Sequence, residues 1–262
     1  MIISLSAYRT SLITKIEERL SRFIQKGDPL SDAIHYALLG PGKRIRPLLV
    51  IMSAETFGIS SELALDAACA LEMVHTYSLI HDDLPCMDDD DLRRGRPTVH
   101  RVYGEAVALL AGDALLTHSF EMIAKTDKIE NEVKLRLIDC LVKRAGKQGM
   151  IGGQIKDITA SQPSFSESLE MFEQKTGDLF SCSLEFGALL GKASPKQIEE
   201  MRSLGLCIGL AYQLRDDLID SDGFLDPEQS KNTLQTTLSR IDELLALLPV
   251  NAPLVKLISS IF

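Results

Sequence analysis

The chain has no excess of positive charge, and this deficit removes one class of protein. Its 262 residues contain 28 Lys and Arg against 37 Asp and Glu, which gives a formal net charge of -9. Nucleic acid is therefore not expected as the main partner, because binding a phosphate backbone requires a basic surface. An anionic small substrate is compatible with the acidity, since bound metal ions can reverse the local field.

The chain also lacks paired cysteines, a secretory leader and long apolar runs. Its five cysteines are widely spaced and form no Cys-x-x-Cys pair, which argues against a disulfide framework or a zinc knuckle. No basic segment followed by an apolar stretch and a cleavage site begins the sequence. No apolar run approaches the length of a bilayer span. We therefore expect a soluble, cytoplasmic protein without a transmembrane segment.

Helical periodicity dominates what is present. Apolar residues recur at three- and four-residue steps from Leu5 to Phe23, and further helical patterns cover 63–80, 106–123, 133–141, 169–190, 198–218 and 234–248. Glycine and proline separate these segments, while alternating strand patterns are scarce and no Asn-Gly hairpin signal occurs. The sequence predicts one all-α domain over residues 1–262, a bundle of about ten helices.

An aspartate cluster ends one apolar helical stretch, at Asp216, Asp217 and Asp220. Residues three and four apart share a helix face, so these carboxylates repel one another unless a cation neutralises them. Gln213 lies three residues earlier and faces the same side. A solvated acidic face is the alternative interpretation. Acidic residues that emerge from a buried stretch are more often functional, which favours a metal site.

A separate cluster contains Asp82, Asp83 and the run 88–91, with Pro85 between its two parts. Proline cannot continue a helix interior, so the helix is predicted to end near Asp83 and a short excursion to bring Asp88 back toward Asp82. A solvated loop is the favoured interpretation for residues 89–91. Oxygen-only ligands select hard cations, and magnesium takes a few carboxylates plus substrate phosphates. The two clusters predict a diphosphate site closed by Mg²⁺.

Basic residues supply the second half of this prediction. Arg93 and Arg94 follow the Asp82 cluster directly, and guanidinium groups bind phosphate with two donors; charge compensation of the aspartates is the alternative. Lys43 and Arg46 would share one face if a helix starts there, forming a second anion site. His75 lies seven residues before Asp82 on the same helix, although a lone histidine there is more often a core residue.

Together these motifs resemble the trans-isoprenyl diphosphate synthase family, in particular its bacterial farnesyl diphosphate synthase branch. The resemblance covers roughly residues 30 to 222 and rests on five ordered motifs. These are Lys43-Arg44-x-Arg46-Pro47, the first aspartate motif with Arg93-Arg94, Gly153-Gln154 with Asp157, Lys175-Thr176-Gly177, and Gln213 with Asp216-Asp217-x-x-Asp220. It implies the isoprenoid synthase fold around a central apolar cavity, a homodimer and three Mg²⁺ ions per site.

The resemblance also implies a role for each motif residue. Asp82 and Asp88 would ligate two magnesium ions and Asp216 a third, with Asp83, Asp217 and Asp220 in support. The allylic diphosphate would be held by Arg93 and Lys175, and isopentenyl diphosphate by Lys43, Arg46, His75 and Arg94. The catalytic residues would be Lys175, Thr176 and Gln213, with Thr176 and Gln213 near the developing allylic cation and with Lys175 and Gln213 also contacting substrate.

Product length is expected to depend on Tyr77 and Ser78, which precede the first aspartate motif. In the family a bulky aromatic residue there acts as a floor, which implies a fifteen-carbon product. Ordinary aromatic packing is the alternative interpretation of Tyr77. A geranylgeranyl diphosphate synthase remains the alternative product assignment.

The segment after Asp220 departs from the family pattern. The family continues through a loop rich in glycine and lysine, whereas this chain runs almost directly to Lys231-Asn232-Thr233. Lys231 is kept as a candidate substrate-binding residue, but the lysine that usually precedes it is absent. A weakly active partner subunit is therefore one alternative. A terpene cyclase is another, disfavoured because a cyclase has no second diphosphate for Lys43, Arg46 and Arg94 to hold.

Overall fold

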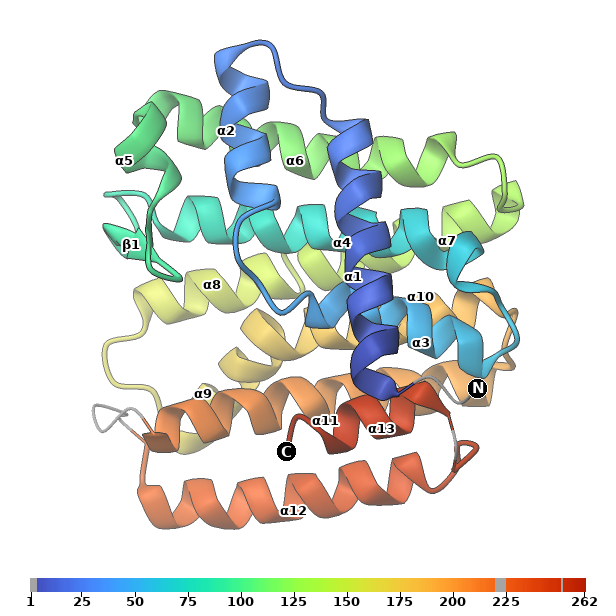
Figure 1. Ribbon diagram of the computed structural model, residues 1–262. Coiled ribbons are helices and arrows are strands. Elements are labelled where there is room, and N and C mark those ends of the chain that lie inside the picture. Colours follow the sequence, from blue (N-terminus) through green and yellow to red (C-terminus); the bar gives the residue numbers. More distant parts are fainter. Residues whose placement is uncertain (1–3, 220–224, 251) are drawn as a thin grey trace. The chain divides into compact units, whose positions relative to one another are not determined.

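The computed structural model describes residues 4–219, 225–250 and 252–262, and the chain divides into two compact units. Unit 1 is Met1–Leu48 with Ser61–Glu130, and unit 2 is Leu49–Ser60 with Asn131–Phe262. The described residues are mostly helical, with one two-stranded ribbon (Figure 1). The predicted all-α class is therefore confirmed. A single domain over the whole chain stays a prediction.

Unit 1 is built around two long helices that pack against each other, α4 and α6. Figure 1 shows them side by side. The elements of this unit are α1 (Leu5–Phe23), α2 (Pro29–Leu38), α4 (Ser61–Asp82), β1 (Leu92–Arg93), β2 (Arg96–Pro97), α5 (Val99–Tyr103) and α6 (Glu105–Lys125). Helix α3 (Ile45–Thr56) begins in unit 1 and continues into unit 2.

Burial in unit 1 follows the apolar pattern of the sequence. Leu12, Ile16 and Leu20 of α1 are fully buried, as the three- and four-residue spacing predicts. Helix α4 is buried on most of its faces. Both α4 and α6 are long and apolar enough to cross a membrane by length and composition alone, contrary to the expectation above. The most apolar 18-residue stretch of α4 is 72% buried within the protein, as in a core helix.

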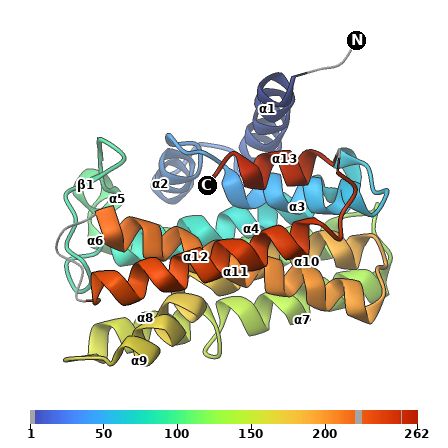
Figure 2. The same ribbon diagram turned by 90° about the horizontal axis from the view of Figure 1, so that it is seen from below.

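Unit 2 places three long helices, α10, α11 and α12, next to one another (Figures 1 and 2). Its elements are α7 (Asn131–Ala145), α8 (Met150–Thr159), α9 (Phe165–Phe172), a π-helix η1 (Glu173–Gly177), α10 (Asp178–Leu190), α11 (Pro195–Ile219), α12 (Pro227–Leu245) and α13 (Pro253–Ser259). Asp226 caps α12 by accepting a hydrogen bond from the Gln229 amide at 2.8 Å. This cap starts the helix directly after the acidic motif.

Five of the shorter helices, α2, α3, α5, α8 and α13, lie outside the predicted helical ranges, and two further features were not predicted from the sequence. The helix expected over 169–190 contains the π-helical turn η1, which local apolar spacing does not reveal. Strands β1 and β2 form a hairpin around Arg94 and Gly95, whose φ angles are 52° and 76°. Positive φ at both central residues is typical of a tight type I′ turn. Arginine stands where asparagine or aspartate usually marks this turn, so the signal was missed.

Candidate active site

The first aspartate motif begins where α4 ends, at Asp82. The Asp88 amide donates a hydrogen bond to the Asp82 carbonyl at 2.9 Å, and the Asp89 amide donates to Leu84. The chain therefore leaves the helix at Asp82, passes Pro85 and returns. The predicted excursion that brings Asp88 back to Asp82 is present.

Asp83 directly follows the end of the helix and is almost fully buried. Its carboxylate accepts a hydrogen bond from Arg93 Nε at 2.5 Å, and Arg93 Nη2 also donates to Asp90 at 3.0 Å. Burial raises the Asp83 pKa while Arg93 opposes that shift. In this arrangement Arg93 compensates two aspartates, which was the alternative interpretation of this residue. The metal role of Asp83 and the diphosphate role of Arg93 stay predictions.

Four guanidinium groups gather near His75 in unit 1, and we call them the arginine cluster: Arg44, Arg46, Arg93 and Arg94. Arg46 Nη1 lies 3.3 Å from His75 Nε2, and Arg94 Nη1 donates to the Pro41 carbonyl at 2.9 Å. A cluster of this kind attracts phosphate, because each group offers several donors in a plane. The structure thus brings together three of the four residues predicted to hold isopentenyl diphosphate.

Gly42 allows two of these groups to converge. A Cβ atom at this position would lie 2.5 Å from Arg94 Nη1 and 2.6 Å from Arg44 Nη1. Arg44 is buried and pairs with Glu72 at 3.3 Å and Glu17 at 3.1 Å. Its charge is therefore already compensated, so Arg44 supports the cluster rather than adding to its excess charge.

His75 is the one member of this region that stays neutral. Its pKa is well below the usual histidine value, because burial and then Arg46, Arg94, Arg93 and Arg44 all disfavour protonation. A neutral imidazole carries one donor and one acceptor nitrogen. His75 can therefore contribute a hydrogen bond without adding a fifth positive charge.

Lys43 does not share a helix face with Arg46 as predicted. Helix α3 begins at Ile45, and Arg44 before it has a φ of 50°. This left-handed residue turns the chain between Lys43 and the helix. Lys43 is exposed, and its substrate role stays a prediction.

Tyr77 is buried on α4, and its ring meets that of His81 edge to face at 5.7 Å between centroids. Burial, with Asp82 as a smaller cause, raises its pKa to about 12. The hydroxyl has no hydrogen-bond partner among the described residues, so the ring contributes bulk rather than polarity. Ser78 donates to the His75 carbonyl at 2.9 Å, a contact within the helix.

Arg96 was missed in the sequence and lines a cavity of about 60 Å³ together with Arg93 and Arg94. Its guanidinium carbon lies 4.1 Å from the centroid of the Tyr36 ring, a cation–π distance. The sequence does show Arg96 as a third arginine, directly after Gly95. It escaped notice because the direction of a side chain from a two-residue strand depends on the hairpin turn.

In unit 2 the π-helix η1 carries Lys175 and Thr176. Single π turns occur mainly at functional sites. Lys175 Nζ pairs with Asp157 of α8 at 2.5 Å. Gly153 of α8 makes this approach possible, because a Cβ there would lie 2.2 Å from the Lys175 amide nitrogen. The Gly153 motif on α8 and the Lys175 motif on η1 are therefore packed against each other.

Two of the three predicted catalytic residues, Thr176 and Gln213, are in contact. Thr176 Oγ1 donates a hydrogen bond to Gln213 Oε1 at 3.1 Å. This contact fixes the Gln213 carbonyl oxygen and leaves its amide group to act as a donor or to orient a neighbour. Thr176 of η1 thus contacts Gln213 of α11, while Lys175 of the same turn contacts Asp157 of α8; a shared catalytic site stays a prediction.

The second aspartate motif lies at the end of α11, where Asp216 and Asp217 are partly buried. Asp220 lies outside the described residues. Arg215, next to Asp216, donates from Nη1 to the Ile261 carbonyl at 2.5 Å. Lys231 is exposed on α12. Its substrate role stays a prediction.

The donor chemistry of both motifs fits Mg²⁺. Asp82 and Asp88 in unit 1 and Asp216 in unit 2 offer carboxylate oxygens, which hard divalent cations prefer. Among the residues that the structure describes, no three His, Cys, Asp or Glu side chains form a ready metal cage. Magnesium commonly binds one or two carboxylates and completes its shell with water and substrate phosphates, so the donor set suits an ion that arrives with a diphosphate.

Comparison with known proteins gives one consistent result. A family described as polyprenyl synthetase matches residues 28–235. The farnesyl diphosphate synthase of Bacillus subtilis is 45% identical over 215 residues, which cover 79% of this chain and 73% of the relative. A geranylgeranyl pyrophosphate synthase of Arabidopsis thaliana is 41% identical over 222 residues, covering 82% of this chain and 64% of the relative.

Solved structures agree with the sequence relatives. An apo FPP/GFPP synthase from Zymomonas mobilis has a TM-score of 0.91 at 35% identity, with 98% of each chain covered. A geranyltransferase from Legionella pneumophila has a TM-score of 0.87 at 30% identity, covering 98% of this chain and 95% of that one. The chain therefore has the fold of the prenyl synthases.

Proposed function

The chain belongs to the polyprenyl synthetase family, and we propose that it condenses isopentenyl diphosphate with dimethylallyl and geranyl diphosphates to give mainly farnesyl diphosphate. The observation that carries this proposal is the pair of separate anion-binding sets. One is Arg46 and Arg94 with neutral His75 in unit 1, and the other is Lys175 with the Thr176–Gln213 pair in unit 2. Two diphosphate substrates require two such sets.

Isopentenyl diphosphate binds at the first set in this proposal. Arg46, Arg94 and Lys43 neutralise its phosphates, and His75 adds a hydrogen bond. The arrangement of Arg46 beside His75 at 3.3 Å supports this role. The C–O bond of isopentenyl diphosphate does not break, because this substrate keeps its diphosphate during the reaction.

The allylic diphosphate binds at the second set, with Lys175 on its phosphates and Arg93 in support. Both basic groups are paired with aspartates in the structure, Lys175 with Asp157 and Arg93 with Asp83. Substrate phosphate competes for these donors. The Thr176 hydroxyl and the Gln213 carbonyl oxygen present partial negative charge to the allylic cation, which favours its formation.

Asp82, Asp88 and Asp216 are the residues that would hold magnesium, with Asp83, Asp217 and Asp220 in support and three ions per site. Bound Mg²⁺ would neutralise the charge that grows on the leaving diphosphate. The C–O bond of the allylic diphosphate breaks, the isopentenyl double bond attacks the freed carbon, and a proton leaves to the departing diphosphate. Apolar helix walls that exclude water protect the cation.

The product assignment rests on Tyr77. Its buried ring and unpaired hydroxyl are suited to limit the length of an apolar chain. Geranylgeranyl diphosphate is the second candidate product, and the 41% identity to a plant geranylgeranyl pyrophosphate synthase supports it. A weakly active partner subunit is the third candidate, favoured by the missing lysine before Lys231.

Two further parts of the proposal concern assembly and location. We propose a homodimer, supported by large apolar side chains that are exposed on α6 and on α7: Leu109, Leu110, Leu135 and Val142. Exposed apolar side chains of this size are typical of surfaces that bind a partner. Helix α6 is long and apolar enough to cross a membrane, and only 39% of its most apolar 18-residue stretch is buried. A subunit interface over α6 would explain this exposed apolar surface. We propose a cytoplasmic location.

The test is a radiolabelled isopentenyl diphosphate assay with dimethylallyl or geranyl diphosphate, run with Mg²⁺ and with a chelator. We expect elongation to farnesyl diphosphate that stops when the metal is removed. Cyclised hydrocarbon would support a terpene cyclase, and a folded protein that makes no product would support the partner subunit. Sedimentation of the same preparation measures the oligomeric state.

A further inference from the structure

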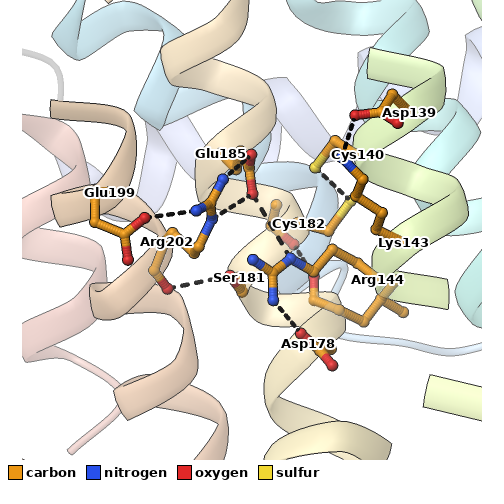
Figure 3. Close-up of polar contacts among 12 residues, drawn as sticks. Asp139, Cys140, Lys143, Arg144, Asp178, Ser181, Cys182, Glu185, Glu199 and Arg202 are labelled. Atoms are coloured by element: carbon orange, nitrogen blue, oxygen red, sulfur yellow. Dashed lines mark hydrogen bonds and ion pairs between the residues drawn. The ribbon is translucent and has the colours of Figure 1, made fainter. Parts of the chain in front are cut away.

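Two acidic side chains are buried on α10 in unit 2, and each is met by an arginine from a different helix (Figure 3). Arg144 of α7 donates from Nη1 to Asp178 Oδ1 at 2.6 Å. Arg202 of α11 donates from Nη2 and Nε to the two oxygens of Glu185, at 2.8 and 3.1 Å. The proposed substrate contacts use none of these four residues.

Each of the two buried carboxylates has its own arginine as its main partner. Glu185 is bound through both oxygens by Arg202, and Arg144 Nε reaches it only at 3.7 Å. Asp178 has Arg144 as its hydrogen-bonded cation. Because Asp178 is only 6% exposed, loss of Arg144 would leave a buried carboxyl group without a partner, which is costly.

Asp178 also closes the π-helix. Its amide donates to the Glu173 carbonyl, five residues earlier, which is the hydrogen bond that defines the π turn. The same residue therefore holds the turn through its backbone and is fixed to α7 through its side chain. Lys175 and Thr176 lie inside this five-residue turn.

A π turn relaxes readily, because the α-helical hydrogen-bond pattern is more favourable. Relaxation would absorb one residue and rotate the segment before it by about 100° relative to α10. Such a rotation would carry Lys175 away from Asp157 and Thr176 away from Gln213. One turn from the Arg144–Asp178 pair, the thiols of Cys140 and Cys182 lie 3.7 Å apart, so α7 and α10 are in close contact at this point (Figure 3).

We propose that Arg144 is a positioning residue for the allylic diphosphate site, acting through Asp178 to hold the π turn that presents Lys175 and Thr176. This inference rests on the proposed function, because it assigns Lys175 to the allylic substrate. Arg144 touches no substrate. Its effect falls on the allylic substrate only, since the residues proposed to hold isopentenyl diphosphate (Lys43, Arg46, His75 and Arg94) all belong to unit 1.

The experiment compares Arg144→Met with Arg144→Lys in the full chain. We expect Arg144→Met to raise the KM for geranyl diphosphate roughly tenfold, because displacement of binding groups by about 1 Å is enough for such a loss. The KM for isopentenyl diphosphate should change less than about twofold. Arg144→Lys keeps the charge and should restore most of the lost affinity. Hydrogen exchange of amides 173–178 should accelerate in Arg144→Met.

Two matched controls separate positioning from general damage. Lys143→Met breaks the neighbouring pair with Asp139, which is exposed, and should change neither KM. Arg202→Met breaks the pair with Glu185, seven residues beyond Asp178, and should lower the melting temperature while leaving the KM for geranyl diphosphate unchanged. If Arg144→Met does not fold, the double variant Arg144→Met with Asp178→Asn removes both buried charges and should show the same selective KM increase.

The inference is overturned by an unchanged KM for geranyl diphosphate in folded Arg144→Met, or by an equal rise for both substrates. A wild-type chain that condenses no substrates would overturn the proposed function instead. In that case hydrogen exchange of amides 173–178 still decides whether Arg144 holds the π turn.

Discussion

The two units hold their basic residues in different ways. In unit 1 the arginine cluster gathers four guanidinium groups on elements joined by a hairpin and a glycine turn, and buried Glu72 compensates one of them. In unit 2 a single lysine, Lys175, is presented by a π turn and paired with Asp157. The first site depends on accumulated charge, whereas the second depends on the geometry of one helix turn.

This difference has a consequence for how each site fails. In unit 1 several guanidinium groups lie together, two of them paired with carboxylates, so a small displacement of one member changes the summed field little. A single ammonium group is effective only within hydrogen-bond reach of its phosphate. Unit 1 should therefore be sensitive to loss of charge, and unit 2 to loss of position as well as loss of charge.

The largest expected effect comes from removing one cation in each unit. Lys175→Gln should raise the KM for geranyl diphosphate by ten- to a hundredfold, about 1.5–3 kcal/mol for a charged hydrogen bond, with little change for isopentenyl diphosphate. Arg94→Gln should show the reverse selectivity. Steady-state kinetics with each substrate varied in turn measures both.

Exposed ion pairs provide the controls for these two variants. Lys156→Gln breaks the pair between Lys156 of α8 and Glu170 of α9, and Arg101→Gln breaks the pair with Asp91. Both should leave the two KM values near those of the wild type, since exposed pairs contribute little. If Lys175→Gln and Arg94→Gln weakened the same substrate, the assignment of one substrate to each unit would be wrong.

A smaller effect is expected from Tyr77 in unit 1, on product rather than on rate. Tyr77→Ala or Tyr77→Ser should lengthen the product beyond farnesyl diphosphate, because the buried ring no longer blocks the growing chain. Tyr77→Phe should leave the product unchanged, since the hydroxyl has no partner among the described residues. Chromatography of the dephosphorylated products gives the comparison, and an unchanged profile for all three variants would remove Tyr77 from this role.

The smallest effect concerns the pH dependence of folding stability. The His75 pKa is far below its usual value in the folded chain, so the unfolded chain binds more protons below about pH 6.5 and stability falls as the pH falls. Between about pH 6.5 and 5.5 this loss should reach at most about 1 kcal/mol. His75→Gln should remove it from urea titrations at the two pH values.

Two neighbouring groups set the controls for this measurement. Burial raises the Glu72 pKa in the folded chain. As the pH falls, the folded chain therefore takes up a proton at Glu72 before the unfolded chain does, which stabilises the fold and opposes the His75 effect. Glu72→Gln should make the loss of stability with falling pH steeper. His35 on α2 has a smaller downward pKa shift, from burial and Lys26. His35→Gln should flatten the profile less than His75→Gln; equal slopes in wild type and His75→Gln would contradict the assignment.

Several local features were predictable because neighbouring residues encode them. Pro85 predicted both the end of α4 and the return of Asp88. That Thr176 and Gln213 would both lie near the allylic cation was implied by the family resemblance rather than by local spacing; the structure shows the hydrogen bond that joins them. Lys43 and Arg46 were wrongly placed on one face, because the left-handed conformation of Arg44 depends on its burial against Glu72 rather than on its own preference.

The sequence by itself determined the helical class, the approximate extent of the long helices α1, α4, α6 and α11, and the chemistry of the two acidic motifs. These follow from apolar spacing, proline and the repulsion of adjacent carboxylates, all of which act over a few residues. Only the tertiary structure decided that Arg93 binds Asp83, that Lys175 lies on a π turn and that Arg144 meets Asp178, 34 residues away. Such contacts depend on how helices distant in sequence pack, and packing is set by the whole set of side chains between them.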